Sequence, residues 1–322
     1  MVAAVSVRKN GFAEMAFVGA LPWHGLGQEL AAGADLETWK QSAGMDWQIK
    51  RSRVRFGSDD NSQIFDQHHV LFRSDTKAPL SIVSPKYKIV QPGEVLEFFR
   101  DLTAANGYTL NTAGTLFDGK RFWALASIGE EACVVGEDKI GGYLLLSSSC
   151  DGTLATTAKF TTVRVVCNNT LGMALSTKSR NEVTVRHTTR FDAESAKQQL
   201  GLARDNFGDF LMASRQLAAK RVNNTMAELF VTQLLTEDTK TVVGKDVAKS
   251  KQFMKIMDLF KGSAMGGTLA SVDGSAWGMV NAVTEFVDHH ARAASDAHRL
   301  TSAWFGRGDD LKTLAFEKAL AL

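Results

Sequence analysis

The sequence is poor in cysteine and proline, and it has no long apolar run. Three cysteines among 322 residues, with no CxxC pair, argue against a disulfide scaffold and a cysteine-based zinc module, so we expect a reducing, cytoplasmic compartment. No stretch approaches the ~20 apolar residues of a membrane-spanning helix, so we expect no membrane partner. No proline follows Pro92, and this proline-free remainder favours helices and central strands.

The sequence also lacks a large excess of positive or negative charge. The 37 Lys and Arg residues against 35 Asp and Glu residues give a net charge of +2, which excludes a polybasic binder but leaves room for a local basic groove. Hydrophobic residues make up 44% and charged residues 22%, as in a folded protein with a core rather than a disordered chain. The length suits one large domain or two ordinary ones.

The common catalytic motifs are absent as well. The sequence contains no GxSxG, GxGxxG or P-loop motif, so we expect no nucleotide hydrolysis. Glu285 and His289 stand four residues apart and could share a metal edge, but no third ligand is evident and a solvated helix surface is the favoured interpretation. Cys167 is interpreted as a small buried hydrophobe. We therefore expect no enzyme, no catalytic residue, no metal and no cofactor.

The pattern of elements predicts an α+β protein. Alternating apolar runs on either side of Asp118-Gly119 and Asp151-Gly152 predict two β-hairpins, which form an antiparallel core. Asn168 or Asn169 is expected to cap a short helix over 168–176. The remaining strands are expected at 46–56, 63–73, 80–84 and 182–188, and helices at 92–107, 191–222, 223–235, 246–260, 275–300 and 310–322.

These elements change in class near residue 190. Residues 1–190 are predicted to form a β-rich α+β domain that carries a nucleic-acid groove, and residues 191–322 a helical domain. The boundary is a change of class rather than a linker, so two lobes that share one core remain possible.

Two groups of basic residues could bind phosphate. Arg51, Arg53 and Arg55 alternate along a predicted strand, so they share a face that suits either a phosphate backbone or a charged edge strand. Residues 151–191 carry an excess of +4 in a chain of net charge +2. Its six basic residues are Lys159, Arg164, Lys178, Arg180, Arg186 and Arg190. Lys120 and Arg121 join them at the first hairpin, together with the aromatic residues Phe122, Trp123 and Phe160, which we interpret as core.

The run RVVCNNTL, residues 164–171, is the most distinctive stretch. Arg164 at a strand end, followed by Asn168 and Asn169, could present a guanidinium, amides and backbone N–H groups to a phosphate. Simple helix capping, or an internal pair of Arg164 with Asp151, is the alternative. Lys312 near the C-terminus is expected to be a mobile surface lysine.

Several segments together resemble a family of phage- and plasmid-encoded proteins, which is a domain family of unknown function. They are PWHGLG near the N-terminus, CDGT at 150–153, RVVCNNTL at 164–171, NAVTEFVDH at 281–289 and SAWFGRG at 302–308. The resemblance runs from about Trp23 to Leu320, and it implies a mobile-element gene acting in a bacterial cytoplasm, with no established activity. The layout of 92–176 is more distantly similar to ring-forming single-strand annealing proteins, whose basic core holds single-stranded DNA.

We therefore expect a single-stranded DNA-binding protein that anneals strands and works as a homo-oligomer. The edges of strands 46–56 and 182–188 would join the protomers, and a ring is one closed form of such an assembly. The expected nucleic-acid contacts are Arg51, Arg53, Arg55, Lys120, Arg121, Lys159, Arg164, Asn168 and Asn169. The alternatives are an interaction protein that binds a host defence or restriction factor through its helical half, and a metal-dependent hydrolase or nuclease.

Overall fold

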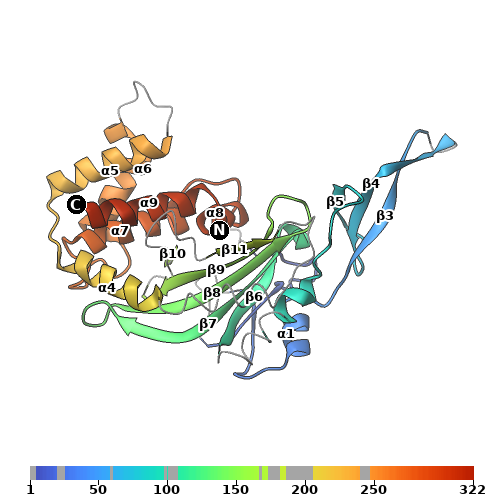
Figure 1. Ribbon diagram of the computed structural model, residues 1–322, viewed down its shortest axis with the longest axis horizontal. Helices are drawn as coiled ribbons and strands as arrows, with labels where there is room; N and C mark the ends of the chain where they lie inside the picture. The colour runs from blue at the N-terminus through green and yellow to red at the C-terminus, as the bar shows by residue number, and fades with distance from the viewer. Residues whose placement is uncertain are drawn as a thin grey trace.

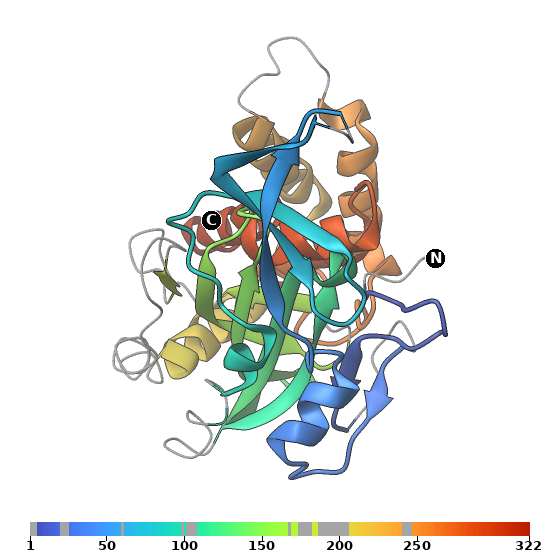
Figure 2. The ribbon, with the colours of Figure 1, turned by 90° about the vertical axis from the view of Figure 1, so that its right-hand side faces the viewer.

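The computed structural model describes residues 5–19, 26–58, 61–97, 100, 108–166, 169–172, 182–185, 206–239 and 247–322. Within these ranges the fold is α+β, with a sheet-rich N-terminal half and a mainly helical C-terminal half, as the sequence predicts (Figure 1). The chain forms two separate sheets, a large one in the body of the molecule and a small one that projects from it (Figure 1). In Figure 2 the small sheet, in blue and cyan, faces the viewer in front of the body.

The large sheet has eight strands and is built around two antiparallel hairpins. Its order is β10-β9-β8-β7-β6-β1-β2, with β11 also paired to β9. The bounds are β1 Met15–Phe17, β2 Gln28–Glu29, β6 Thr109–Leu116, β7 Arg121–Cys133, β8 Lys139–Ser149, β9 Thr156–Arg164, β10 Asn169–Gly172 and β11 Glu182–Val185. The predicted hairpins at Asp118-Gly119 and Asp151-Gly152 are confirmed as the β6–β7 and β8–β9 connections. Both Asp118 and Gly119 adopt positive φ, which glycine accepts without strain.

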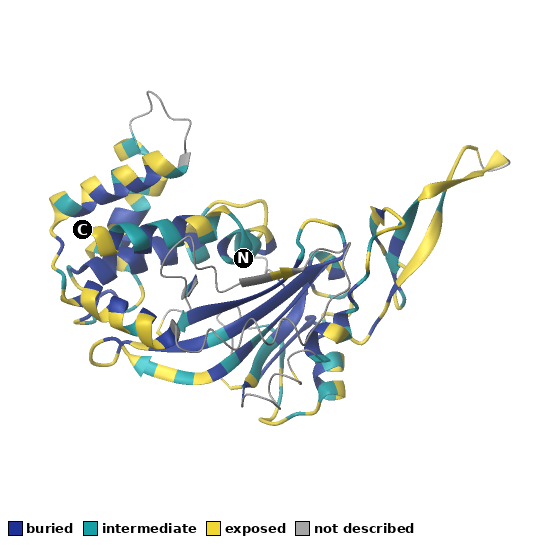
Figure 3. Cartoon of the chain, in the orientation of Figure 1, coloured by how far each residue is buried: buried dark blue, intermediate teal, exposed yellow. Residues whose placement is uncertain are grey.

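The small sheet consists of β3 Ile49–Phe56, β4 Gln63–Arg73 and β5 Pro79–Val83, with β4 in the centre. This sheet, which we call the arm, extends away from the body in Figure 1. Its outer part is coloured as exposed in Figure 3, whereas the strands of the large sheet are mostly buried. The arm therefore offers side chains to solvent on a scaffold of paired strands.

The helices are α1 Leu36–Ser42, α4 Asn206–Ala219, α5 Asn224–Thr239, α6 Lys251–Asp258, α7 Ala276–Glu285, α8 Asp296–Phe305 and α9 Arg307–Ala321. Polar side chains start several of them, because a hydroxyl or amide oxygen accepts from a backbone N–H that has no helical partner. Asn223 caps α5 in this way, and Ser250, Ser275 and Ser295 cap α6, α7 and α8. Residues 92–97 are helical, which confirms the start of the helix predicted after Pro92.

Two expected elements are wrong. The short helix predicted over 168–176 is instead strand β10 at Asn169–Gly172, because its backbone completes the exposed edge of β9 and its Thr170 N–H donates to Asp288. The single helix predicted over 275–300 is two helices, α7 and α8. A π-helical turn and a non-helical stretch over 291–295 separate them, and Ser295 then starts α8.

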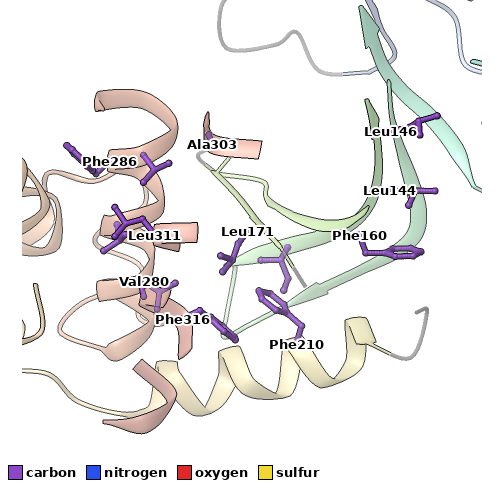
Figure 4. Close-up of a cluster of buried hydrophobic side chains, with 14 of the residues drawn as sticks. Leu144, Leu146, Phe160, Leu171, Phe210, Val280, Phe286, Ala303, Leu311 and Phe316 are labelled. Atoms are coloured by element: carbon purple, nitrogen blue, oxygen red, sulfur yellow. The ribbon is translucent and has the colours of Figure 1, made fainter. Parts of the chain in front are cut away.

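One large hydrophobic cluster joins the sheet to the C-terminal helices (Figure 4). Phe160 of β9 and Leu144 of β8 belong to it, as do Phe210 of α4 and Phe316 of α9, whose rings stack with centroids 5.1 Å apart. A smaller cluster on the other face of the sheet contains Leu145 and Trp123 with residues of α8. The two halves predicted to divide near residue 190 therefore share a core.

Candidate nucleic-acid interface

The arm carries the exposed arginines that the sequence singled out. Arg51, Arg53 and Arg55 are all exposed on β3, together with Lys50. Side chains alternate along a strand, so the three arginines occupy one face of β3 and lie about 6.6–7 Å apart. The register shift next to Arg53 places its extra residues on β4, which leaves the alternation of β3 intact.

The charge of this strip is not neutralised within the described part of the chain, where Lys50, Arg53 and Arg55 make no ion pair with a carboxylate. Arg51 donates from Nη2 to the carbonyl of Tyr87, so its guanidinium is oriented by the backbone. An exposed cation that has no ion-pair partner in the protein gains electrostatic stabilisation only when it binds an anion. The strip is therefore suited to an anionic partner.

Apolar side chains lie beside the arginines near the tip of the arm, and the sequence analysis did not identify them. Phe56, Ile64 and Phe65 are 53%, 37% and 39% exposed. Exposed aromatic residues at the end of a projecting ribbon are unusual in the absence of a partner, because such surface is normally buried. The sequence contained one signal for this apolar surface: Phe56 and Ile64 stand before and after the polar turn segment that joins β3 to β4.

A buried ionic cluster fixes the base of the arm to the body. Arg73 at the end of β4 donates to Glu14 at 2.7 Å and to Asp75 at 2.9 Å, and its guanidinium lies 4.2 Å from the ring centroid of Trp47. Burial raises the pKa of Glu14, but hydrogen bonds from Arg73, Thr115 and Arg8 outweigh burial and lower the pKa overall. Glu14 is therefore held ionised, and the arm is attached through its charge.

In the second predicted group of basic residues, the members Arg121, Lys159 and Arg164 are buried and do not line an open groove. Lys178, Arg180, Arg186 and Arg190 of that group lie outside the described residues. Arg164 is 3% exposed, and its Nε donates to Asp138 at 2.6 Å while Nη1 donates to the carbonyl of Met265 at 3.2 Å. The internal pair considered for Arg164 therefore exists, but its partner is Asp138 and not Asp151. Asp138 also accepts from Ser271 and Trp277, so the cluster joins the sheet to the helices.

Lys159 is likewise enclosed where α8 meets α9. Its Nζ donates to Asp309 at 2.8 Å and to the carbonyl of Trp304, and it lies 5.2 Å from the ring centroid of Phe305. Lys159 is only 6% exposed. Because its ammonium group is enclosed, Lys159 cannot reach a phosphate backbone. The expectation of a surface contact at Lys159 is therefore corrected.

Arg121 is 5% exposed and differs from the other buried cations. It donates to the hydroxyls of Thr301 at 2.6 Å and Thr153 at 2.7 Å, and Thr153 in turn donates to Asp151 at 2.6 Å. Burial lowers its pKa, and the charge of Asp151 acts in the opposite direction. The charge of Arg121 is thus balanced by Asp151 through the Thr153 hydroxyl. The expected open contact with DNA is corrected for Arg121 too.

The remaining predicted contacts have mixed outcomes. Lys120 is half-buried beside the β6–β7 turn. Asn169 begins β10 and does not start a helix, and Asn168 lies outside the described residues. Lys312 is not a mobile surface lysine, because it is 1% exposed and donates to Asp288 at 2.8 Å and to the carbonyl of Thr170 at 2.6 Å.

Glu285, which was considered with His289 as a metal ligand, has another role in the structure. Glu285 is 3% exposed and accepts from the backbone N–H of Met265 at 3.0 Å, so it serves as an internal acceptor between α7 and the loop that precedes it. Burial raises its pKa. Within the described ranges, no group of three His, Cys, Asp or Glu side chains is arranged to hold a metal ion.

Among the helices that the structure describes, none is both long and apolar enough to cross a membrane.

Comparison with known proteins places the chain in a family. No curated protein and no solved structure matches it. A family model described as "Domain of unknown function (DUF932)" matches residues 79–304, which include β5 of the arm, most of the large sheet and the helices through most of α8. The match covers well over half of the 322 residues, so the chain belongs to the DUF932 family.

Proposed function

We propose that this protein binds single-stranded DNA through the arm and promotes the annealing of strands in a phage or plasmid recombination system. The observation that carries the proposal is the exposed strip of Arg51, Arg53 and Arg55 on a projecting strand. The proposal moves the contact surface from the predicted groove on the large sheet to the arm, since Arg121, Lys159 and Arg164 of that groove have partners inside the protein. It requires no catalytic residue, metal or cofactor.

The chemistry of the strip suits a phosphate backbone. Arginine presents a planar fork of donors that can bind phosphate bidentately, and it stays charged at any physiological pH. Residues 49–88 contain eight basic and four acidic residues, an excess of +4 that exceeds the net charge of the whole chain. Such a local field raises the rate at which a polyanion meets the arm.

A homo-oligomer forms part of the same proposal. In the described part of the chain, β3 pairs only with β4, so its edge is available for another protomer in the absence of DNA. Open edges of this kind are normally covered or guarded, and repeated head-to-tail pairing closes into a ring when the rotation allows. Light scattering with and without DNA tests this point, and a monomer under both conditions would refute it.

The binding proposal is tested by titrating labelled single strands at several salt concentrations. Each phosphate contact on a single strand adds about 0.7 to the slope of log affinity against log salt. The double variant Arg53→Ala/Arg55→Ala should therefore lower that slope by about 1.4, with weaker binding at low salt. Arg51 is left intact because it also contacts the Tyr87 carbonyl.

The matched control removes the same charge elsewhere. Lys251 and Lys261 are exposed at the start of α6 and after its end, far along the chain from the arm. The variant Lys251→Ala/Lys261→Ala should keep the wild-type slope. Equal slopes for wild type and both variants would remove the arm from the binding surface, and no binding at ~50 mM salt would defeat the proposal altogether.

An interaction protein that binds a host defence or restriction factor is the second candidate. It is favoured by exposed apolar side chains on three consecutive helices of the C-terminal half. Met212 of α4, Leu229 of α5 and Met254 of α6 are 57%, 59% and 54% exposed. An apolar interface would bind nearly independently of salt, so the same titration, repeated with a candidate partner protein, separates the two functions.

A further inference from the structure

The two faces of β3 near the tip of the arm differ in chemistry. One face carries Arg53 and Arg55, and the other carries Phe56, because neighbouring residues of a strand point to opposite sides. Residues paired across antiparallel strands share a side, so Phe65, which is opposite Val54, lies on the Phe56 face. The arm therefore has an arginine face and an aromatic face along the same strand.

The aromatic face is organised rather than incidental. The ring centroids of Phe56 and Phe65 lie 6.3 Å apart in an edge-to-face arrangement, with an interplanar angle of 88°. The ring of His68 stacks on Phe65 at 5.2 Å with an interplanar angle of 8°. His68 supports one side of Phe65, and both phenylalanines still have more than a third of their surface exposed.

This arrangement matches the chemistry of an unpaired nucleic-acid strand. Such a strand has phosphates on one side and bases with free π faces on the other, and base–aromatic stacking tolerates any base. Because β3 is the outer strand of the arm, a single strand lying along its edge can place phosphates on the arginine face and bases on the aromatic face. A duplex keeps its bases stacked inside and can satisfy only the arginine face.

We propose that Phe56 and Phe65 form a stacking platform for unpaired bases, through which the arm distinguishes single strands from duplex. This inference rests on the proposed binding of nucleic acid by the arm, and it assigns the selection of single strands to the aromatic face. Asp66, which is exposed on β4, places a negative charge on the β4 side of the arm and so supports an approach of the DNA along the β3 edge.

The test compares oligo(dT) of about 30 nucleotides with an abasic strand of the same length. The two probes carry the same phosphates, but only the first carries bases. Wild-type protein should bind oligo(dT) about tenfold more tightly than the abasic strand, as expected for stacking of one or two bases. The variant Phe56→Leu/Phe65→Leu should bring the two affinities close together while leaving the salt slope unchanged.

Leucine is chosen because it keeps an apolar side chain of similar size but has no π face. The variant Arg53→Ala/Arg55→Ala is the complementary control, and it should lower the salt slope while keeping the preference for oligo(dT). Circular dichroism and the melting temperature check that both variants fold.

The possible failures of the two proposals are distinguishable. If wild-type protein binds both probes in a salt-dependent manner but equally well, or if the leucine variant keeps the preference, the platform is refuted while the arginine face stands. If wild-type protein binds neither probe, the proposed function itself fails. If the leucine variant changes the oligomer mass and not the ratio of affinities, the aromatic face contacts a second copy of the chain, and the platform is overturned.

Discussion

Arg164 and Asp138 form a buried pair whose exposed fractions are 3% and 0%. Isolated charges are costly to bury, so removing one partner leaves the other with an uncompensated charge. The remaining partners of Asp138, Ser271 and Trp277, donate hydrogen bonds but carry no charge. The pair therefore belongs to the stability of the fold rather than to its surface.

The variant Arg164→Met should lower the free energy of unfolding by about 3 kcal/mol, because Asp138 loses its counter-charge. Its affinity for DNA per folded molecule should stay near that of wild type. Urea denaturation and the titration described above measure the two quantities separately. The exposed Lys251 of α6 provides the control, and Lys251→Ala should change neither.

Lys312 should behave like Arg164 and not like Lys251. Asp288, its partner, is nearly enclosed, with 8% of the side chain exposed. If Arg164→Met or Lys312→Ala unfolds at the wild-type urea concentration while DNA binding is lost, the internal assignment of that residue is wrong.

The arm is attached to the body through Glu14 and Arg73, and this attachment should depend on pH. The pKa of Glu14 in the folded protein lies below its ordinary value of 4.5. A lowered folded-state pKa contributes stability that is fully present above about 4.5 and is lost as the pH falls through the folded-state pKa. The attachment is therefore complete at neutral pH and fails in acid.

The variant Glu14→Gln should be less stable than wild type by about 3 kcal/mol at pH 7, and the difference should shrink as the pH is lowered below 4.5. Thermal melts at several pH values between about 3 and 7 measure it. Glu37, an exposed residue of α1, serves as the comparison, and Glu37→Gln should give a small difference at every pH. A Glu14→Gln difference that is constant with pH would show that the carboxylate charge does not fasten the arm.

At the scale of the elements, the secondary structure shows which of them can be predicted from local sequence signals. The turn residues Asp118-Gly119 and the cap Asn223 act through their own neighbours in sequence, so their elements could be predicted. Asn169–Gly172 became a strand because β9 offered an open edge, and this edge comes from a different part of the chain. The break over 291–295 is secured by Arg299, whose Nε donates to the carbonyl of Asp288, a contact that periodicity cannot reveal.

At the scale of the whole molecule, buried contacts cross the boundary near residue 190. The large core cluster holds Phe160 together with Phe210 and Phe316, and the pairs of Asp138 with Arg164 and of Lys159 with Asp309 lie against helices of the C-terminal half. Neither half can satisfy these groups alone, because each would expose apolar surface and leave charged groups without partners.

The chain should therefore unfold in one cooperative transition, and residues 1–190 expressed alone should lack stable tertiary structure. Calorimetry tests the first point by comparing the calorimetric with the van't Hoff enthalpy of unfolding. Amide hydrogen exchange on the fragment tests the second. Two resolved transitions, with protected amides in the isolated fragment, would show that the halves are independent domains.

The sequence by itself determined the α+β class, the two central hairpins, the absence of the common catalytic motifs and the arginine strip on β3, because composition, turn residues and alternation act over a few neighbouring residues. Tertiary structure decided which basic residues reach solvent. Arg55 and Arg164 both follow β-forming residues, but Arg55 lies on a projecting strand, whereas Arg164 is buried beside α7 and the turn segment before it, which supply Asp138 with its other partners. Exposure depends on what the rest of the chain packs against each strand, and no local pattern encodes that.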